Sequence, residues 1–169
     1  RKNKGETMAA NIRFATEADI PVILEFIHAL AAYENMEDQV IVTPELLKEW
    51  VFQKKKAEVF LVSEDEKPVG FALFFHNFST WLGRAGIYLE GLFVLPEYPG
   101  KRYGELLLTR LARLALQRGC GRLEWACLDW NTPSRKFYDS LGAVRMEEGT
   151  TYRLTGDALL SLASNISLK

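Results

Sequence analysis

The chain has 169 residues, of which 48% are hydrophobic and 25% are charged, and its formal net charge is −1. This length and balance predict a globular protein with its own core and exclude a disordered chain. The near-zero charge gives no general attraction to nucleic acid or to an anionic membrane, and no apolar stretch is long enough to span a bilayer. We therefore expect no nucleic-acid partner and no membrane partner.

The start of the chain and its cysteines bear on the compartment. Residues 1–10 are basic and are not followed by the apolar stretch of a signal peptide, so we expect a flexible tail there and a single domain over residues 11–169. Cys120 and Cys127 form no CxxC pair, which predicts free thiols in a reducing, cytoplasmic compartment. The two histidines lack metal-site spacing, and we expect no metal.

The first half of the chain predicts a strand, two helices and a three-stranded meander. A strand at 11–16 leads into a helix whose apolar stripe repeats at helical spacing from Ile20 to Ala31. Thr43 and Pro44 start a second helix that runs through about residue 52. Strands follow at 58–64, 68–77 and 86–95, the first two joined by a hairpin turn at 65–68.

The second half predicts a crossover helix followed by shorter elements. A loop at 96–104 precedes an amphipathic helix over 104–117, and a fifth strand covers 122–129. A short helix then runs from Asn131 to Gly142, with short strands near Ala143 and Thr151 and a final helix after Asp157. The fold class is α/β (α+β), with a central mixed, mostly antiparallel twisted sheet of about six to seven strands flanked by helices.

The loop before the crossover helix has the features of an anion site. The first N–H groups of a helix lack internal partners and its dipole favours negative charge, while Gly100 and Gly104 let a ligand approach the backbone. An ordinary strand-to-helix connection explains the same stretch when it is taken alone. It is not a P-loop, because no GK[ST] follows.

A second motif lies further along the chain. "NTPSRKFYDSLGA" has the pattern N-x-x-S-x-x-F-Y-x-x-x-G, in Asn131, Ser134, Phe137, Tyr138 and Gly142. Together with the glycine-bearing loop, this pattern resembles the GNAT superfamily of acetyl-CoA-dependent N-acetyltransferases. The stretches "AAYENMEDQV", "STWLG", "YLEGLFVLPEY" and "LDWNTPSRKFYDSLGA" are similar to the diamine (spermidine/spermine) acetyltransferase branch and its bacterial relatives.

The resemblance implies a function and a set of site residues. Members of this branch transfer an acetyl group from acetyl-CoA to a primary amine of a polyamine, a diamine or a lysine- or thialysine-like amino acid, by direct attack in a ternary complex, and are typically homodimers. The implied substrate-binding residues are Tyr33, Glu34, Glu37, Trp81, Glu90 and Trp130. The implied cosubstrate-binding residues are Phe93, Val94, Gly100, Lys101, Arg102, Tyr103, Gly104, Glu105, Asn131, Ser134, Lys136 and Phe137.

Several residues depart from the family pattern. Pro99 stands where the CoA loop usually has Gln or Arg, and Arg102 stands where it has its middle glycine. Gly91 and Ser79 occupy two positions that are acidic in the diamine branch. The loss of two acids argues against a long polycation as substrate. The altered loop leaves an alternative, a catalytically weakened CoA-binding or protein-interaction module on the same fold.

The chemistry of acetyl transfer assigns roles to two residues. A lysine-like amine has a pKa near ~10.4 and must lose a proton before it attacks, and Glu90 is a carboxylate that can accept this proton. Gly91 beside it permits a β-bulge. Tyr138, a phenol with a pKa near ~10, can donate a proton to the leaving thiolate. Plain packing is the alternative for Tyr138, and a solvated strand residue or a structural ion pair is the alternative for Glu90. Tyr33, Glu34 and Glu37 equally fit a charged surface, and Trp81 equally fits plain packing.

Overall fold

The computed structural model describes residues 10–98 and 102–165. The chain divides into two compact units, Arg1–Ala126 and Cys127–Lys169, and each is described by itself. The expected N-terminal tail lies outside the described residues except for Ala10, which begins the first strand. The single domain over 11–169 stays a prediction.

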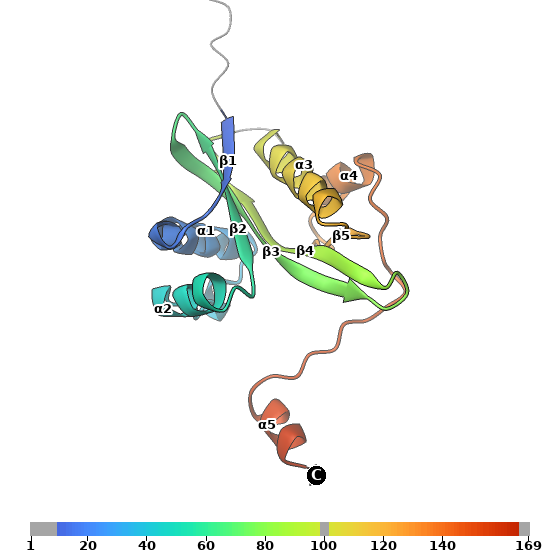
Figure 1. The fold of residues 1–169 in the computed structure, drawn as a ribbon. Coiled ribbons are helices and arrows are strands. Elements are labelled where there is room, and N and C mark those ends of the chain that lie inside the picture. The colour runs from blue at the N-terminus through green and yellow to red at the C-terminus, as the bar shows by residue number, and fades with distance from the viewer. Residues whose placement is uncertain (1–9, 99–101, 166–169) are drawn as a thin grey trace, which may run out of the picture. The chain divides into compact units, whose positions relative to one another are not determined.

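The first unit is built on a mixed sheet (Figure 1). Its five strands, in spatial order, are β1 (Ala10–Phe14), β2 (Glu58–Glu64), β3 (Lys67–Ser79), β4 (Arg84–Val94) and β5 (Leu123–Trp125). Neighbours from β1 to β4 are antiparallel, whereas β4 and β5 are parallel because helix α3 (Arg102–Gln117) connects them. The predicted meander and its crossover are therefore confirmed.

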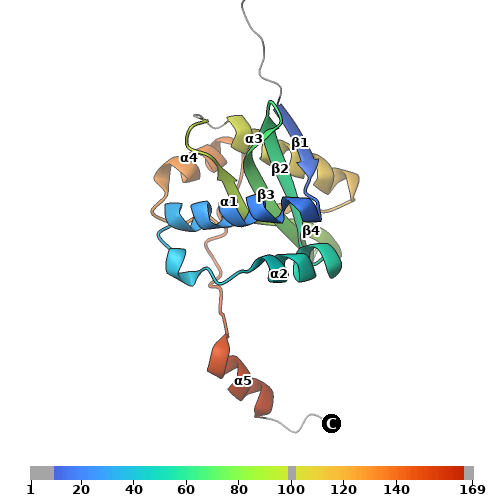
Figure 2. The same cartoon turned by 90° about the vertical axis from the view of Figure 1, so that its left-hand side faces the viewer.

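Helices cover both faces of this sheet (Figures 1 and 2). One face carries α1 (Ile20–Tyr33) and α2 (Pro44–Leu47), and the other carries α3. The second predicted helix exists over the expected range, but after Leu47 it continues as a π-helix, η3 (Lys48–Gln53). Two 3₁₀ turns, η1 (Glu17–Asp19) and η2 (Glu37–Gln39), flank α1.

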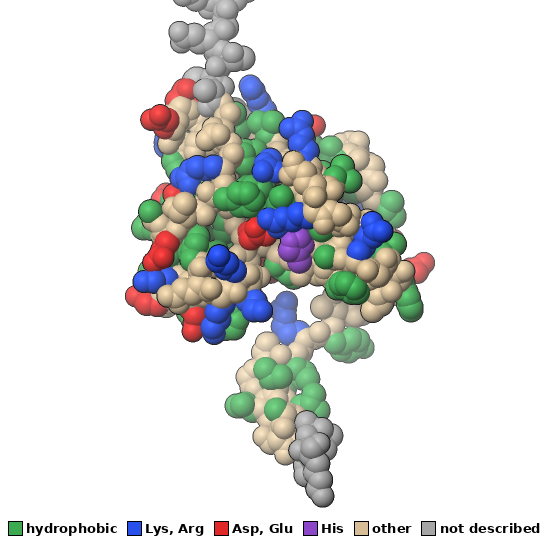
Figure 3. Space-filling view, viewed as in Figure 1, with side chains coloured by type: hydrophobic (Ala, Val, Ile, Leu, Met, Phe, Trp, Pro, Cys, Tyr) green, Lys and Arg blue, Asp and Glu red, His purple; other side chains and the backbone are tan. Residues whose placement is uncertain are grey.

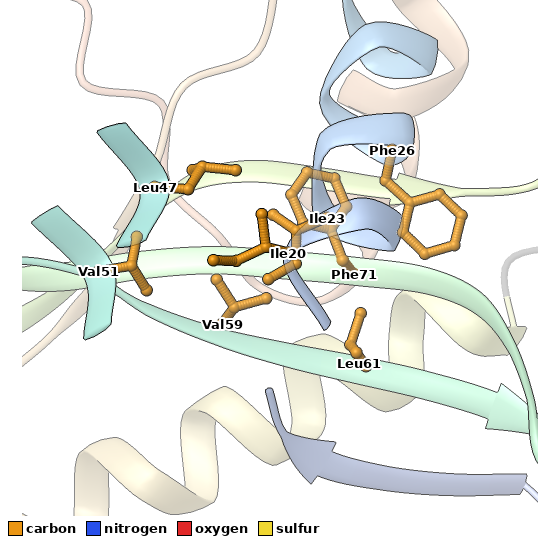
Figure 4. Close-up of a cluster of buried hydrophobic side chains, with 8 residues drawn as sticks. All are labelled: Ile20, Ile23, Phe26, Leu47, Val51, Val59, Leu61 and Phe71. Carbon is orange, nitrogen blue, oxygen red and sulfur yellow. The ribbon is translucent and has the colours of Figure 1, made fainter. Parts of the chain in front are cut away.

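Two apolar layers hold the sheet between its helices. The layer under α1 and α2 contains Ile20, Ile23, Phe26, Leu47, Val51, Val59, Leu61 and Phe71 (Figure 4). On the α3 side the rings of Phe60 and Phe74 lie 5.1 Å apart, and the Arg110 guanidinium lies 4.9 Å from the Phe60 ring. Burial of large aliphatic and aromatic side chains is the main favourable contribution to folding, so this sandwich is the rigid support of the site.

A charged contact joins the end of α3 to the sheet. Arg118 donates two hydrogen bonds to Glu58, at 2.6 and 2.8 Å, and its Nη1 lies 2.9 Å from His76 Nε2. The other ring nitrogen of His76 lies 3.0 Å from the Gly86 carbonyl oxygen. Figure 3 shows a histidine side chain near basic and acidic side chains on one face of the molecule. The guanidinium holds the pKa of Glu58 below its usual range.

The second unit contains two helices, α4 (Thr132–Ser140) and α5 (Gly156–Ser164). The Asn131 side chain accepts a hydrogen bond from the Ser134 N–H at 3.4 Å, and Gly142 has a φ of 86°, so both predicted ends of α4 are confirmed. The short strands expected near Ala143 and Thr151 were predicted wrongly. Residues 143–155 contain no strand, because their backbone does not pair with a neighbouring strand. The described sheet therefore has five strands instead of the expected six or seven.

The start of α1 is fixed by one carboxylate. Asp19 accepts two hydrogen bonds from the Arg13 guanidinium, at 2.7 and 2.8 Å, and one from the Thr16 backbone N–H at 2.7 Å. These contacts form part of a capping box and link β1 to the helix. Hydrogen bonding to Arg13 is the largest cause that lowers the pKa of Asp19 to about 2.

We predict that Asp19→Asn lowers the free energy of unfolding at neutral pH by about 1–2 kcal/mol. This value is less than the pKa shift alone implies, because the Arg13 partner is partly exposed and solvent weakens the interaction. Because the folded pKa is depressed, the stabilisation is full above the unfolded value of about 3.9 and is lost as the pH falls through about 2. Urea unfolding of both proteins between pH 7 and pH 2 measures this difference. Glu17→Gln, which removes an exposed partner of Lys48, is the control and should cost much less. If Asp19→Asn lowers the free energy of unfolding by the same amount at pH 2 as at pH 7, the ionised Asp19 carboxylate is not the stabilising group.

Candidate active site

Strand β4 carries one extra residue relative to β3. Leu89 pairs with Phe74 and Gly91 pairs with Leu73, so Glu90 is left without a partner in the ladder. The bulge predicted from Gly91 is thereby confirmed. Gly91 is buried, and a β-carbon added there would lie 3.4 Å from Leu30 Cδ2, so the bulge lies against the end of α1.

The bulge also coincides with the end of the parallel pairing. Strand β5 pairs with β4 only from Ile87 to Leu89, and the last pair joins Leu89 to Trp125. Beyond it, β4 continues to Val94 while β5 has ended. The backbone of residues 90–94 therefore has no ladder partner on the β5 side within the described chain, and its polar groups can bind an extended ligand.

Two carboxylates meet near the bulge. Glu34 is the C-terminal cap residue of α1, and burial raises its pKa above the usual range, with a further contribution from the charge of Glu90. Burial likewise raises the pKa of Tyr88, and the charges of Glu90 and Glu124 add to this effect. The site therefore has an excess of negative charge around a partly buried phenol, an environment that favours a cation.

The other expected substrate residues lie further from this pair. Tyr33 is 55% exposed at the end of α1, and Glu37 is exposed in η2. Trp81 is 95% exposed in the turn between β3 and β4. The neighbouring Arg84 lies six residues before Glu90 on β4, which corresponds to roughly 20 Å along the strand. Within this unit, Trp81 is therefore not brought together with Glu90.

The two positions without the expected acids have structural explanations. Ser79 is buried, and its hydroxyl oxygen accepts a hydrogen bond from the Leu82 N–H at 3.1 Å, so it stabilises the turn between β3 and β4. Gly91 faces Leu30 and Phe71 in the apolar layer. Neither residue contributes charge to the site.

The residues expected to bind the cosubstrate have different surroundings. The Phe93 ring lies 6.1 Å from that of Phe26, in the layer under α1, so Phe93 offers the site its backbone and not its side chain. Tyr103 is buried, and its hydroxyl donates a hydrogen bond to Glu64 at 2.7 Å. This side chain therefore has a structural role in the fold. Pro99, Gly100 and Lys101 lie outside the described residues.

The start of α3 remains suited to an anion. Arg102 is the first residue of the helix and is exposed, and Gly104 and Glu105 follow in the first turn. The open position of Gly104, where an added β-carbon would meet no atom within 4 Å, leaves space beside the first turn. Unpaired N–H groups and the helix dipole provide the attraction, and the permanently charged Arg102 can add to it.

The second unit positions the tyrosine of the motif. Asn131 caps α4, Ser134 lies in its first turn, and Lys136 is exposed on its surface. Tyr138 is partly buried, with its ring 5.6 Å from that of Phe137. Trp130 precedes the helix and is more than half exposed. The short capped helix therefore holds the phenol in a defined local structure.

Sequence reasoning missed a polar cluster on strands β3 to β5. Asn77 donates a hydrogen bond to Glu124 at 2.9 Å, and Arg122 Nε lies 2.8 Å from the same carboxylate oxygen. Glu124 is paired with Tyr88 across the sheet. The alternating charges at 122 and 124 were the only sequence signal, and they indicate contacts only when the strand register is known.

Other kinds of site have no support among the residues that the structure describes. These residues contain no cluster of three or more potential metal ligands. Both cysteines are free, as expected. No helix in the described ranges is long and apolar enough to cross a membrane.

Comparison with known proteins gives relatives over nearly the whole chain. The thialysine N-epsilon-acetyltransferase of Bos taurus is 37% identical and covers 90% of this chain and 96% of its own length. The L-ornithine N5-acetyltransferase NATA1 of Arabidopsis thaliana is 29% identical and covers 94% of this chain and 90% of its own. Among solved structures, an integron cassette protein from the mobile metagenome of V. cholerae is 27% identical, with a TM-score of 0.77, covering 94% of this chain and 99% of its own.

The family model described as the acetyltransferase (GNAT) family matches residues 24–143. This range runs from within helix α1 through the β4 bulge to the motif on α4. Since the match covers more than half of the chain and the bovine relative exceeds 30% identity over most of it, the chain belongs to the GNAT acetyltransferase family.

Proposed function

We propose that this N-acetyltransferase transfers the acetyl group of acetyl-CoA to a primary amine of a small basic amino acid or short diamine. The observation that carries the proposal is the β4 bulge, where an unpaired strand edge begins beside a carboxylate. The edge fits an extended cosubstrate, and the carboxylate fits an amine that must lose a proton. Acetyl-CoA supplies the activated thioester.

Glu90 is proposed as the general base. It accepts the proton of the acceptor ammonium, directly or through one water, so that the neutral amine attacks the thioester carbonyl carbon. The free N–H groups of the strand edge at 90–94 are suited to hold the cosubstrate and to stabilise negative charge on the carbonyl oxygen. Tyr138 is proposed as the acid that donates its phenolic proton to the departing sulfur.

Binding of the cosubstrate is assigned to the start of α3. Its free N–H groups and the Arg102 guanidinium are suited to the pyrophosphate, with Gly104 leaving room for it. The presence of both a base and an acid candidate favours an enzyme over a weakened binding module. We also propose a homodimer, as the family resemblance implies, in the cytoplasm and without a metal, as the cysteine and histidine patterns predict.

The acceptor is proposed from charge. Glu34 and Glu90 attract a cation, but Gly91 and Ser79 provide no further acids for a long polyamine. The relatives named above act on thialysine and on L-ornithine, both basic amino acids, as their names state. These observations support a short acceptor over spermine.

A free-thiol release assay with acetyl-CoA and a panel of amines tests the proposed function. We expect turnover with ornithine, lysine, thialysine or short diamines, and a lower kcat/KM with spermine. Absence of thiol release with every amine, in a protein whose melting temperature acetyl-CoA does not raise, would refute the function, since a ligand at about 100 times its Kd adds roughly 2.7 kcal/mol of stability.

Tyr138→Phe tests the proposed acid. The ring packing is kept and the proton is removed, so kcat should fall on the order of 100-fold while the Kd of acetyl-CoA stays unchanged. Steady-state kinetics and calorimetry measure the two quantities. Asp139→Asn, a change on the same helix that removes the exposed ion pair with Arg145 and keeps the phenol, serves as the control. Unchanged kcat in the Phe variant, with chemistry limiting turnover, would exclude Tyr138 as the acid.

Glu34→Gln tests the negative charge of the amine pocket. Burial and the charge of Glu90 raise the pKa of Glu34 in the folded protein. At pH 7 the ionised Glu34 carboxylate therefore destabilises the folded state. We expect the variant, which lacks this charge, to melt at a higher temperature at pH 7. The KM of a cationic acceptor should nevertheless rise about 10-fold, equivalent to about 1.4 kcal/mol. Thermal melts and kinetics on the same samples separate the effects, and an unchanged KM would place the acceptor away from Glu34.

A further inference from the structure

A polar cluster lies on the sheet next to the candidate base. Glu124 of β5 is paired with Tyr88 of β4, two residues before Glu90. Its Oε1 atom accepts a hydrogen bond from Asn77 at 2.9 Å and forms an ion pair with Arg122 Nε at 2.8 Å. The cluster thus joins three adjacent strands just before the point where β4 and β5 separate.

The cluster depends on a glycine beneath it. A β-carbon at Gly86 would lie 2.5 Å from Asn77 Oδ1 and 3.0 Å from Arg122 Cγ, both closer than ordinary packing allows. The absence of a side chain at this position therefore lets Arg122 and Asn77 fold over β4. A larger residue would displace both side chains, so the arrangement is specific to this combination of residues.

The polar groups of the cluster are not all satisfied. Among the described residues, Asn77 Oδ1 and Arg122 Nε are buried without a hydrogen-bond partner, so the Arg122–Glu124 contact is an ion pair and not a hydrogen bond. The Arg122 and Glu124 side chains are nevertheless 36% and 34% exposed. The two unsatisfied atoms are themselves buried, but the pair presents a cation and an anion side by side, and both side chains are partly exposed to solvent.

We infer that Arg122 and Glu124 bind the zwitterionic head of a basic α-amino acid, with its carboxylate at Arg122 and its α-ammonium at Glu124. This inference rests on the proposed function, because it assigns the far end of the acceptor whose side-chain amine reacts beside Glu90. An amino-acid head carries one charge of each sign on one carbon, which matches an Arg–Glu pair, whereas a diamine has a partner only for Glu124.

The spacing on the sheet suits this acceptor. Two residues along β4 correspond to roughly 7 Å, and the step to β5 adds about 4.8 Å across the sheet. Glutamate side chains reaching from Glu90 and Glu124 shorten this span to one that the side chain of lysine or ornithine can bridge. Tyr88 and the Phe75 ring, which lies tilted against it at 5.3 Å, provide an apolar floor for the methylenes between the two charged ends.

Three acceptors separate the two contacts. Lysine carries both head-group charges, cadaverine lacks the carboxylate, and 6-aminohexanoate lacks the α-amine. Glu124→Gln should raise the KM of lysine and cadaverine about 10-fold and leave that of 6-aminohexanoate unchanged. Arg122→Gln should raise the KM of lysine and 6-aminohexanoate about 10-fold and spare cadaverine. In both variants kcat should stay within about two-fold, because the proposed base and acid are intact.

The controls distinguish a binding role from a structural one. Glu45→Gln, on the exposed surface of α2, removes the same charge elsewhere and should leave all three acceptors unchanged. Loss of stability alone would affect every acceptor equally. If the KM values of all three acceptors change by the same factor in either variant, or do not change, the inference is overturned while the proposed function stands. A wild-type protein that releases no thiol with any of the amines would refute the proposed function itself, and the inference with it.

Discussion

One unpaired residue in β4 organises the candidate site. Because Glu90 is extra relative to β3, the strand bends at this point, and the parallel ladder with β5 ends one residue earlier. The bulge sets a carboxylate near the end of α1, and the end of the β5 ladder beside it leaves a strand edge free at residues 90–94 within the described chain. The two apolar layers on either side of the sheet hold this geometry, which no flexible loop could provide as well.

The electrostatics of the site oppose folding locally and favour a cationic ligand. Burial and the charge of Glu90 raise the pKa of Glu34, and the charge of Glu90 also adds to the raised pKa of the partly buried Tyr88. Such an arrangement is unfavourable without a counter-ion and becomes favourable when an ammonium group binds. The Arg122–Glu124 pair differs, because its positive and negative charges cancel. Such a pair suits a ligand group that also carries one positive and one negative charge. The two features together favour an acceptor with a cationic end and a zwitterionic end.

Much of this structure could be predicted from local signals in the sequence. Helical spacing gave α1 and α3, Thr43 and Asn131 gave helix starts, and Gly91 gave the bulge. The strands expected near Ala143 and Thr151 were wrong, because alternation alone does not supply a pairing partner. The hydrogen bond from Tyr103 to Glu64 and the Arg122–Glu124 cluster depend on residues that only the strand register and the crossover bring together. Such long-range contacts leave little trace in a single sequence.

The most direct test of the account is a crystal structure of the protein with CoA and a basic amino acid bound. We expect the CoA chain to follow the free edge of β4 at residues 90–94, with its sulfur beside the bulge. The side-chain amine of the acceptor should lie within hydrogen-bond distance of the Glu90 carboxylate, or one water away from it. CoA bound away from this edge, or Glu90 paired with a protein cation and turned from the amine, would contradict the central role of the bulge.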